Sequence, residues 1–380
     1  MDCLDRSIRA QTIKLKLCTP NVYTSAIFLK VKESTMSTKY IGIQKCAKII
    51  AETCANVQPG EKVLVIGDFE QVRSIPESII AATHALDAEV LNVNIFPPPG
   101  GPFTKLPESL WDMMKQSDVI FVCTYRRYPI YTTPLLKEIL DSGSRYLQMY
   151  MLTEDIMMRT VPINYDLMKK RVSSLSELLY KAQEVEMISP SGTNLTWSCP
   201  EKRRPYVEWD GLCRKRGEAD AIPGGMCGKV IEEGTASGTL ILDGTFHFRL
   251  LSYDSPPLAD DTIKRMGRIW EPIRLKIEKG RVTRIEGGWM AAVLKKKLEK
   301  EDENATNFAV FGLGLNPGCI VTGYLFEDER RLGSIYTGLG GNVYAGGKTE
   351  SSLTTGFSTP GCTLKLDGKV VLEKNVLKLP

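Results

Sequence analysis

The residues best suited to chemistry in this sequence are an arginine pair and a tyrosine that follow an apolar run. The run DVIFVCTY (118–125) leads directly to Arg126, Arg127 and Tyr128. An arginine fork can hold a carboxylate or phosphate through two parallel hydrogen bonds. We therefore predict that these three residues bind substrate. The alternative is a pair of arginines on the surface or in an interface, without a ligand.

Histidine is scarce in this chain. The sequence contains two, His84 and His247, and we interpret both as structural. Metal sites and general-base catalysis both rely on histidine, so we expect any chemistry to proceed mostly without it. Cys319 and Cys362 follow the turns NPG and TPG. A nucleophilic role would need a base that lowers the thiol pKa, and we interpret both as incidental thiols.

A strand–helix alternation between residues 36 and 185 must position these groups. Apolar runs that predict strands alternate with helical segments, at 62–68, 71–86, 89–96, 107–116, 118–125, 133–142 and 144–152. This alternation is typical of a parallel sheet covered by helices. Such sheets bind ligands at the carboxyl ends of their strands, where the arginine pair falls. No GxGxxG motif follows any of these strands, so we predict no dinucleotide site.

The sequence changes character after a predicted helix at 165–185. Strand-like runs separated by Gly, Asp-Gly and Asn follow, interrupted by one helix near 288–301. This pattern predicts an antiparallel, β-rich domain. We expect an α/β protein with a Rossmann-like domain at 36–185 and a β-rich α+β domain at 186–380. Residues 1–35 show no clear period and precede Met36, so we interpret them as a disordered extension or a start-site artefact.

Composition excludes several classes of protein. The chain has 380 residues, of which 43% are apolar and 25% charged, with a net charge of +4. This balance is ordinary and too weakly basic to favour nucleic acid or a membrane surface as partner. Ten scattered cysteines without a CxxC pair favour reduced thiols. With no long apolar stretch and no secretory signal, we expect a cytoplasmic protein.

The order of the glycine-rich segments in the second domain carries a family resemblance. The segments are SGTLILDG, IRLKIEKGRVTRIEGG, FGLGLNPG, GLGGNVYAGG and LDGKVV. As an ordered set they resemble the aminopeptidase T family and its relative, 2,5-dihydroxypyridine 5,6-dioxygenase. The resemblance implies an aminopeptidase T-like fold and a metal-dependent enzyme. The aminopeptidases hold two metals with Glu, His and Asp, and the dioxygenase holds one iron with two His and one Asp.

The metal ligands that the resemblance implies are absent from the matching positions. The Glu or His before the GxGxNP-like turn falls on Val310, and the His-x-Asp pair falls on Thr354 and Gly356. A further aminopeptidase His falls on Tyr336, and the first Glu falls near Met226. Val, Gly and Met cannot ligate a hard divalent cation, and Thr and Tyr are poor neutral ligands. We therefore predict no family-type metal site and no cofactor.

Polar residues near the cleft implied by this fold are candidates for metal-free chemistry. We predict catalytic roles for Tyr336, Glu327, Lys348 and Glu350, and a substrate-binding role for Thr354. The alternatives are a tyrosine that fills the volume of the former metal, a solvated turn and an exposed hairpin. The turns NPGCIVTG and GLGGNVYAGG are either anion-binding nests or ordinary tight turns.

Three functions remain open from the sequence. The first is a metal-independent enzyme, hydrolase-like or otherwise, that acts on a small amino-acid-, peptide- or heteroaromatic-like substrate, and it predicts a closed polar pocket. The second is a non-catalytic binding or scaffold protein, which predicts an apolar cleft filled by Val310, Tyr336 and Met226. The third is an aminopeptidase-like hydrolase whose metal ligands have moved to other residues. By resemblance we expect a homodimer.

Overall fold

The protein is described by a computed structural model that covers residues 38–96, 106–125, 128, 130, 133–246 and 267–379. Residues 43–380 form one compact unit, and residues 1–42 fall outside it. The predicted extension at 1–35 lies outside the described residues, as do Arg126, Arg127 and His247. No helix in the described part of the chain combines the length and the apolarity needed to cross a membrane.

The first half of the compact unit is built on a parallel sheet. In the described residues its strand order is β2-β1-β3-β4-β8, and every neighbouring pair is parallel. The strands are β1 (Lys62–Asp68), β2 (Glu89–Ile95), β3 (Val119–Cys123), β4 (Arg145–Gln148) and β8 (Ala219–Ala221). Strands β1 and β3 are almost wholly buried, as expected for the centre of such a sheet. The prediction of a parallel α/β sheet is confirmed.

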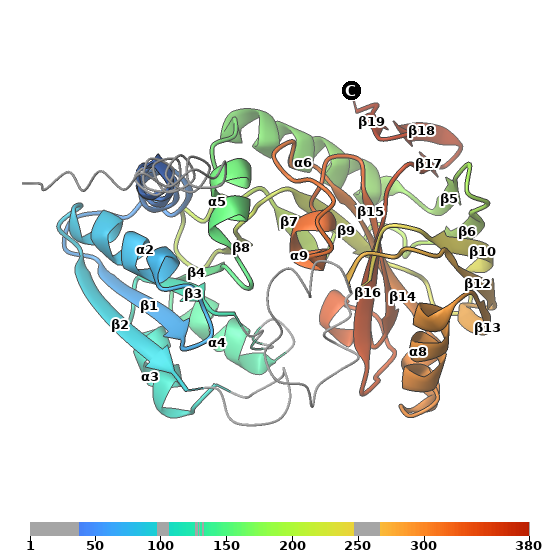
Figure 1. Cartoon of the computed structure of the whole chain (residues 1–380), viewed down its shortest axis with the longest axis horizontal. Helices are drawn as coiled ribbons and strands as arrows, with labels where there is room; N and C mark the ends of the chain where they lie inside the picture. The colour runs from blue at the N-terminus through green and yellow to red at the C-terminus, as the bar shows by residue number, and fades with distance from the viewer. Residues whose placement is uncertain are drawn as a thin grey trace, which may run out of the picture. The chain divides into compact units, whose positions relative to one another are not determined.

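Helices accompany these strands, four of them within the predicted segments 71–86, 107–116, 133–142 and 165–185. They are η1 (Ile49–Cys54), α2 (Ser74–His84), α3 (Ser109–Lys115), α4 (Pro134–Asp141), α5 (Glu154–Thr160) and α6 (Tyr165–Lys181). Helix α2 packs against β1 and β2, and α4 packs against β4 (Figure 1). The N-termini of α5 and α6 are capped by Thr153 and Asn164, whose side chains accept hydrogen bonds from the backbone N–H three residues on.

An antiparallel sheet of eight described strands forms the outer layer of the second half. Its order is β13-β12-β10-β6-β5-β17-β18-β19. The bounds are β5 (Glu184–Ile188), β6 (Asn194–Ser198), β10 (Ser237–Leu242), β12 (Ile273–Glu278), β13 (Arg281–Glu286), β17 (Thr363–Leu366), β18 (Lys369–Glu373) and β19 (Val376–Leu377). Helix α8 (Trp289–Leu298) packs on β12 and β13. It lies within the helix predicted near 288–301.

A second antiparallel sheet, of six described strands, carries the site discussed below. Its order is β11-β16-β15-β14-β9-β7, and β14, β15 and β16 lie side by side in Figure 1. The bounds are β7 (Val207–Trp209), β9 (Met226–Val230), β11 (Thr245–Phe246), β14 (Phe308–Gly314), β15 (Ile335–Gly340) and β16 (Thr354–Thr359). Short helical turns join them, namely η4 (Glu303–Thr306), α9 (Leu325–Asp328) and η5 (Val343–Ala345).

The two antiparallel sheets enclose the second hydrophobic core. Phe311, Leu313 and Phe357 from the six-stranded sheet are buried with Trp197 and Leu240 from the eight-stranded sheet. The Trp197 ring meets the Phe311 ring edge-on, with centroids 5.0 Å apart. Side chains alternate between the two faces of a strand, so this core fixes which residues of β14 and β16 point to the opposite face.

The chain crosses between the two halves more than once. Strand β7 belongs to the six-stranded sheet, β8 joins the parallel sheet beside β4, and β9 returns to the six-stranded sheet. The predicted β-rich segment therefore contributes one strand to the parallel sheet, which the sequence did not reveal. The predicted fold class is confirmed, and the boundary between residues 185 and 186 stays a prediction.

Candidate functional site

Glycines line the face of the six-stranded sheet that points away from the second core. Cross-strand pairing places Gly312 of β14 opposite Gly228 of β9, and Gly338 of β15 opposite Gly356 of β16. The same pairing sets Gly338 opposite Val310. We call the surface that carries these four glycines the glycine face. Because glycine has no side chain, it leaves room above the backbone for a ligand or for neighbouring side chains.

Neighbouring side chains occupy much of that room. A Cβ atom at Gly356 would lie 2.2 Å from Cε2 of Tyr336 and 2.4 Å from its hydroxyl oxygen. A Cβ atom at Gly338 would lie 2.7 Å from Cγ2 of Val310. The terminal methyl of Met226 lies equally close over Gly312, at 2.8 Å from the corresponding Cβ position. Tyrosine, valine and methionine side chains thus rest directly on the glycines.

Further tyrosines extend this cover. Cε1 of Tyr206 would be 3.0 Å from a Cβ atom at Gly228, so this ring lies over the fourth glycine of the row. The rings of Tyr206 and Tyr344 meet edge-on, with centroids 5.7 Å apart. Both pack with Tyr336 against a small buried cluster, made of Val230, Ala309, Val310 and Ala345. The glycine face is therefore covered by apolar and aromatic side chains.

The positions that the resemblance assigns to metal ligands all lie on this face. Val310 is in β14, Tyr336 in β15, Thr354 and Gly356 in β16, and Met226 in β9, on neighbouring strands. The registers Gly312–Tyr336, Gly338–Gly356 and Gly314–Met226 place them on the same side of the sheet. Sequence counting therefore selected positions that share one face of the sheet, although the residues come from four separate strands.

The side chains at these positions do not fit the metal that the fold family implies. A valine, a methionine and a glycine offer no oxygen or nitrogen donor, and the Tyr336 ring fills the space above Gly356. Within the described ranges, no three His, Cys, Asp or Glu side chains gather where they could hold a metal ion. The relocated-ligand hypothesis has no support from these residues.

Glu327, a predicted catalytic residue, lies in α9 and is bound within the protein. Its side chain is fully buried and forms a bidentate ion pair with Arg159 of α5. The Oε1–Nη1 distance is 2.5 Å and the Oε2–Nη2 distance is 3.2 Å. Oε1 also accepts a hydrogen bond from the backbone N–H of Ile320, at 2.9 Å. This carboxylate holds α5, α9 and the preceding loop together.

The neighbouring carboxyl of Asp328 is also buried and has several donors. It accepts hydrogen bonds from the backbone N–H groups of Thr322 and Gly323, at 2.8 and 2.9 Å, and contacts the hydroxyl of Thr245. Burial raises the pKa of Asp328 to about 6, and these hydrogen bonds oppose the rise. The turn NPGCIVTG, considered above as a nest for an external anion, thus directs its N–H groups to the protein's own carboxyls.

Lys348 and Glu350 lie in the turn between η5 and β16, and both are exposed. The backbone N–H of Lys348 donates to Oε1 of Glu233 at 2.6 Å, and the carbonyl of Glu350 accepts from Asn304 at 3.0 Å. These bonds hold the backbone of the turn and leave the two side chains at the surface. The glycine-rich turn before them is also satisfied internally, through Glu233.

The remaining predicted residues are placed as follows. Thr354 is half-buried at the start of β16, on the glycine face with Tyr336. Tyr128 is 1% exposed and belongs to the core of the parallel half, and its carbonyl accepts a hydrogen bond from the Tyr150 hydroxyl at 2.7 Å. The structure thus brings Tyr336 and Thr354 together on one face. Their roles, and those of the other predicted residues, stay predictions.

Several residues of this site were missed from the sequence. Tyr206 and Tyr344 lie in loops and turns whose place beside the glycine face depends on long-range packing. Arg159 gave no signal, because its partner Glu327 lies 168 residues further along the chain. Thr322 is a single hydroxyl-bearing residue within the turn NPGCIVTG, and it carries no motif of its own. A search for polar residues flanking the glycine-rich turns would have found Thr322.

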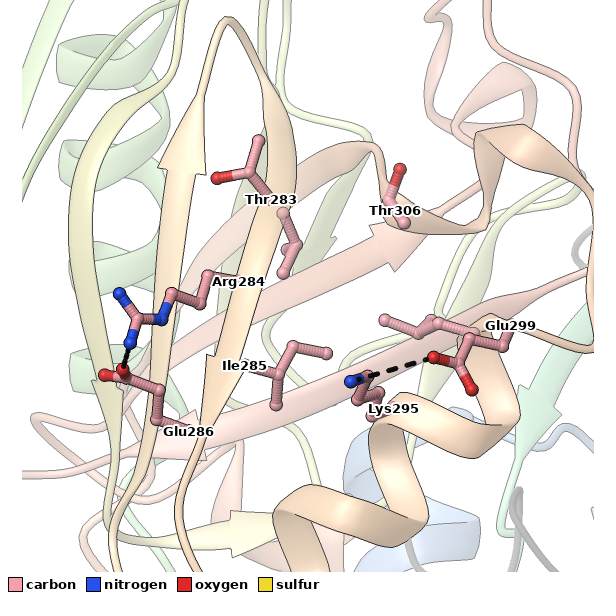
Figure 2. A pocket seen from close by; sticks show the side chains of 9 residues that line it. Thr283, Arg284, Ile285, Glu286, Lys295, Glu299 and Thr306 are labelled. Atoms are coloured by element: carbon pink, nitrogen blue, oxygen red, sulfur yellow. Dashed lines mark ion pairs between the residues drawn. The ribbon is translucent and has the colours of Figure 1, made fainter.

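A groove on the outer surface is separate from these residues. It lies between β13 and α8 and has a volume of about 490 Å³. Figure 2 shows Thr283 and Ile285 from the strand, with ion pairs between Arg284 and Glu286 and between Lys295 and Glu299 at its sides. None of the predicted site residues lines it. The groove has mixed charge and a small apolar floor, and nothing in it selects a ligand.

Comparison with solved structures defines the class of fold. The chain is similar to a 2,5-dihydroxypyridine dioxygenase from Pseudomonas putida KT2440, with a TM-score of 0.70 and 18% identity, covering 89% of this chain and 97% of that one. It is also similar to wild-type AmpT from Thermus thermophilus, with a TM-score of 0.55 and 13% identity, covering 87% and 99%. The protein therefore has an α/β fold similar to those of AmpT and this dioxygenase.

Sequence comparison then gives the family. The chain belongs to the NicX family, described as 2,5-dihydroxypyridine 5,6-dioxygenase, which it matches over residues 44–378. A 2,5-dihydroxypyridine 5,6-dioxygenase from Pseudomonas putida KT2440 is 26% identical over an alignment 250 residues long, which covers 63% of this chain. The match covers 66% of that relative, just under two thirds of its length. The recognised resemblance is confirmed, and the relation is distant.

Proposed function

We propose that this protein is a metal-independent binding protein on a dioxygenase-like scaffold, which does not perform the metal chemistry associated with its relatives. The observation that carries the proposal is the packing of Tyr336, Val310 and Met226 onto the glycines of β14, β15 and β16. These side chains stand where the resemblance places metal ligands. A metal ion would need both different donors and the volume that the Tyr336 ring now occupies.

The same face supports a small planar molecule as the ligand. Tyr336, Tyr206 and Tyr344 are partly exposed, and they surround a buried apolar base. Tyrosine rings offer an apolar surface with a polar tip, which suits aromatic ligands that carry one or two polar groups. The half-buried Thr354 hydroxyl lies on the same face as a further hydrogen-bonding group. A heteroaromatic-like small molecule fits these surroundings best.

Metal content and restored ligands test the first part of the proposal. The purified protein should contain no stoichiometric iron, zinc or cobalt by elemental mass spectrometry, and it should show no oxygen uptake with 2,5-dihydroxypyridine after addition of Fe(II). The matched variant V310H/T354H/G356D/Y336A supplies two His and one Asp and removes the ring above Gly356. We expect this variant to bind iron. Stoichiometric metal or oxygen uptake in the unaltered protein would overturn the proposal.

Ligand binding tests the second part. Heteroaromatic fragments should change the chemical shifts of the glycine-face residues in NMR titrations, and Y336L should weaken their binding roughly tenfold, the loss of about 1.4 kcal/mol of ring contact. The control Y180L alters an exposed tyrosine of α6. Equal affinities for the parent protein, Y336L and Y180L would place the ligand elsewhere.

A metal-independent enzyme is the second candidate function. The observation that favours it is the partly exposed phenol of Tyr336 on the same face of the sheet as the half-buried Thr354, because a phenol can donate a proton to a substrate oxygen. Turnover in chelated buffer that is lost in Y336F, with ligand affinity kept, would favour this reading over a binding protein.

A further inference from the structure

Two adjacent buried carboxyls hold one loop, and this arrangement is independent of the function proposed above. We define residues 316–323, which are separated from the end of β14 by Leu315 alone, as the clamp loop. Its backbone N–H groups at Ile320, Thr322 and Gly323 donate to the carboxyls of Glu327 and Asp328, at 2.8–2.9 Å. Glu327 is 1% exposed and Asp328 0% exposed. The loop is thus held to α9 by acceptors that are out of contact with water.

The hydroxyl of Thr322 lies between the two carboxyls. Its oxygen is 3.0 Å from Oε2 of Glu327 and also 3.0 Å from Oδ1 of Asp328. It further accepts the backbone N–H of Tyr324, at 3.3 Å. A hydroxyl has one proton to donate and two lone pairs. All three contacts are hydrogen bonds when one carboxyl accepts from Thr322 and the other donates its own proton to it.

The surroundings identify which carboxyl carries that proton. Arg159 forms its ion pair with Glu327 and stabilises the ionised form there. No cation in the described part of the chain forms an ion pair with Asp328, and burial raises its pKa to about 6. The other ionisable groups around the pair, among the described residues, are Cys319, whose burial raises its pKa, Asp155 on the far side of Arg159, and Glu329 and Arg330, which pair with each other. Arg268 pairs with Thr245 through a β-bridge, and its exposed guanidinium lies over the Trp270 ring. The facing groups of β11 and β16 are the neutral hydroxyls of Thr245 and Ser358.

We propose that Glu327, Thr322 and Asp328 form a proton-dependent clamp, in which one proton held on Asp328 stabilises the clamp loop in its closed position on α9 and loss of that proton shifts the equilibrium towards opening. In the released state the second carboxylate gains solvation, which it lacks when closed beside ionised Glu327. Because the loop continues β14, which carries Val310 and Gly312, release changes the support of the glycine face. The clamp is thus a regulatory element built from the chain itself.

The sign of the effect follows from linkage. The pKa of Asp328 is about 6 with the loop closed and near 3.8 in a solvated side chain, so the closed state binds more protons between these values. Closure is favoured at low pH and weakens as pH rises through 6. From these two pKa values, the equilibrium constant for opening rises about tenfold between about pH 5 and about pH 8.

Hydrogen exchange of the full chain measures this opening. After correction for the intrinsic pH dependence of exchange, protection of the Ile320, Thr322 and Gly323 amides should fall about tenfold between about pH 5 and about pH 8. D328N keeps a donor toward Thr322 without titrating, so its protection should be independent of pH. The control D155N removes an exposed carboxylate next to Arg159 and should retain the dependence of the parent protein.

Two results would overturn the clamp. One is constant protection of these amides across the pH range in the unaltered protein. The other is the same pH dependence in D328N as in the parent. If D328N fails to fold, infrared spectroscopy of the unaltered protein decides the matter. A protonated carboxyl band that titrates near pH 6 and whose midpoint shifts in T322V, which lacks the hydroxyl partner, supports the clamp, and its absence from the unaltered protein refutes it.

Discussion

The contact between Gly356 and the Tyr336 ring predicts strong coupling between two substitutions. In G356A the new methyl would lie 2.2 Å from Cε2 of Tyr336, whereas ordinary contacts begin at 3.4 Å, so the ring must move by 1.2 Å. Gly356 does not have a positive φ angle, and the strand backbone accepts alanine. Overpacking of this kind costs about 1–3 kcal/mol of unfolding free energy. Removing the half-buried ring in Y336A costs about 2 kcal/mol.

The double variant G356A/Y336A separates this clash from other effects. With the ring absent the methyl has space, so the double variant should be more stable than the sum of the two single changes by about 1–3 kcal/mol. Urea unfolding followed by circular dichroism gives the three free energies, provided that the slope with denaturant stays constant.

A matched control tests whether the coupling is specific. In G67A the new methyl meets the side-chain oxygen of Asn94 at 2.6 Å, in the parallel sheet of the first half and not in the sheet that carries Tyr336. Its cost should therefore add to that of Y336A within about 0.5 kcal/mol. Additive free energies for G356A and Y336A would refute the reasoning, because they would mean that the ring does not lie on Gly356. In that case the space for a metal would also be open.

Three further substitutions test the supporting contacts. R159M leaves the buried carboxylate of Glu327 without its cation and should cost about 2–4 kcal/mol in urea unfolding, whereas D155N should change stability by less than about 0.5 kcal/mol. N316A removes a buried amide that donates hydrogen bonds to the carbonyls of Thr160 and Gly224 and accepts one from the backbone N–H of Gly318. The free energy of unfolding should fall by about 2–4 kcal/mol. An unchanged free energy would show that water replaces the amide. G288A displaces the carboxylate of Glu271, which lies at the N-terminus of α8. The free energy of unfolding should fall by about 0.5–1 kcal/mol, seen as a lower melting temperature. In a protein that already carries E271A, G288A should cause no further loss.

Local patterns in the sequence determined the elements and the fold class. The apolar run at 62–68 became β1, the run at 118–125 contains β3, and the predicted helix at 165–185 contains α6. Local sequence predicts these segments, because a strand buried on both faces needs a continuous apolar run, and an amphipathic helix needs apolar residues that recur every three to four positions. The ordered glycine-rich turns were specific enough to give the family, and residue counting placed Val310 and Tyr336 at one site.

Tertiary structure decided what those residues touch. Glu327 looked like an open catalytic carboxylate in a polar turn, but Arg159 from a distant helix binds it. Lys348 and Glu350 remain at the surface, because their turn is anchored through its backbone. Whether Tyr336 faces a hollow or fills one depends on Gly356, a residue of another strand. The sequence determines which side chains are present and in which strand each one lies. Strand register and helix packing then set the distances between side chains to within a few ångströms. Ion pairing, pKa and the free volume at the site all depend on those distances.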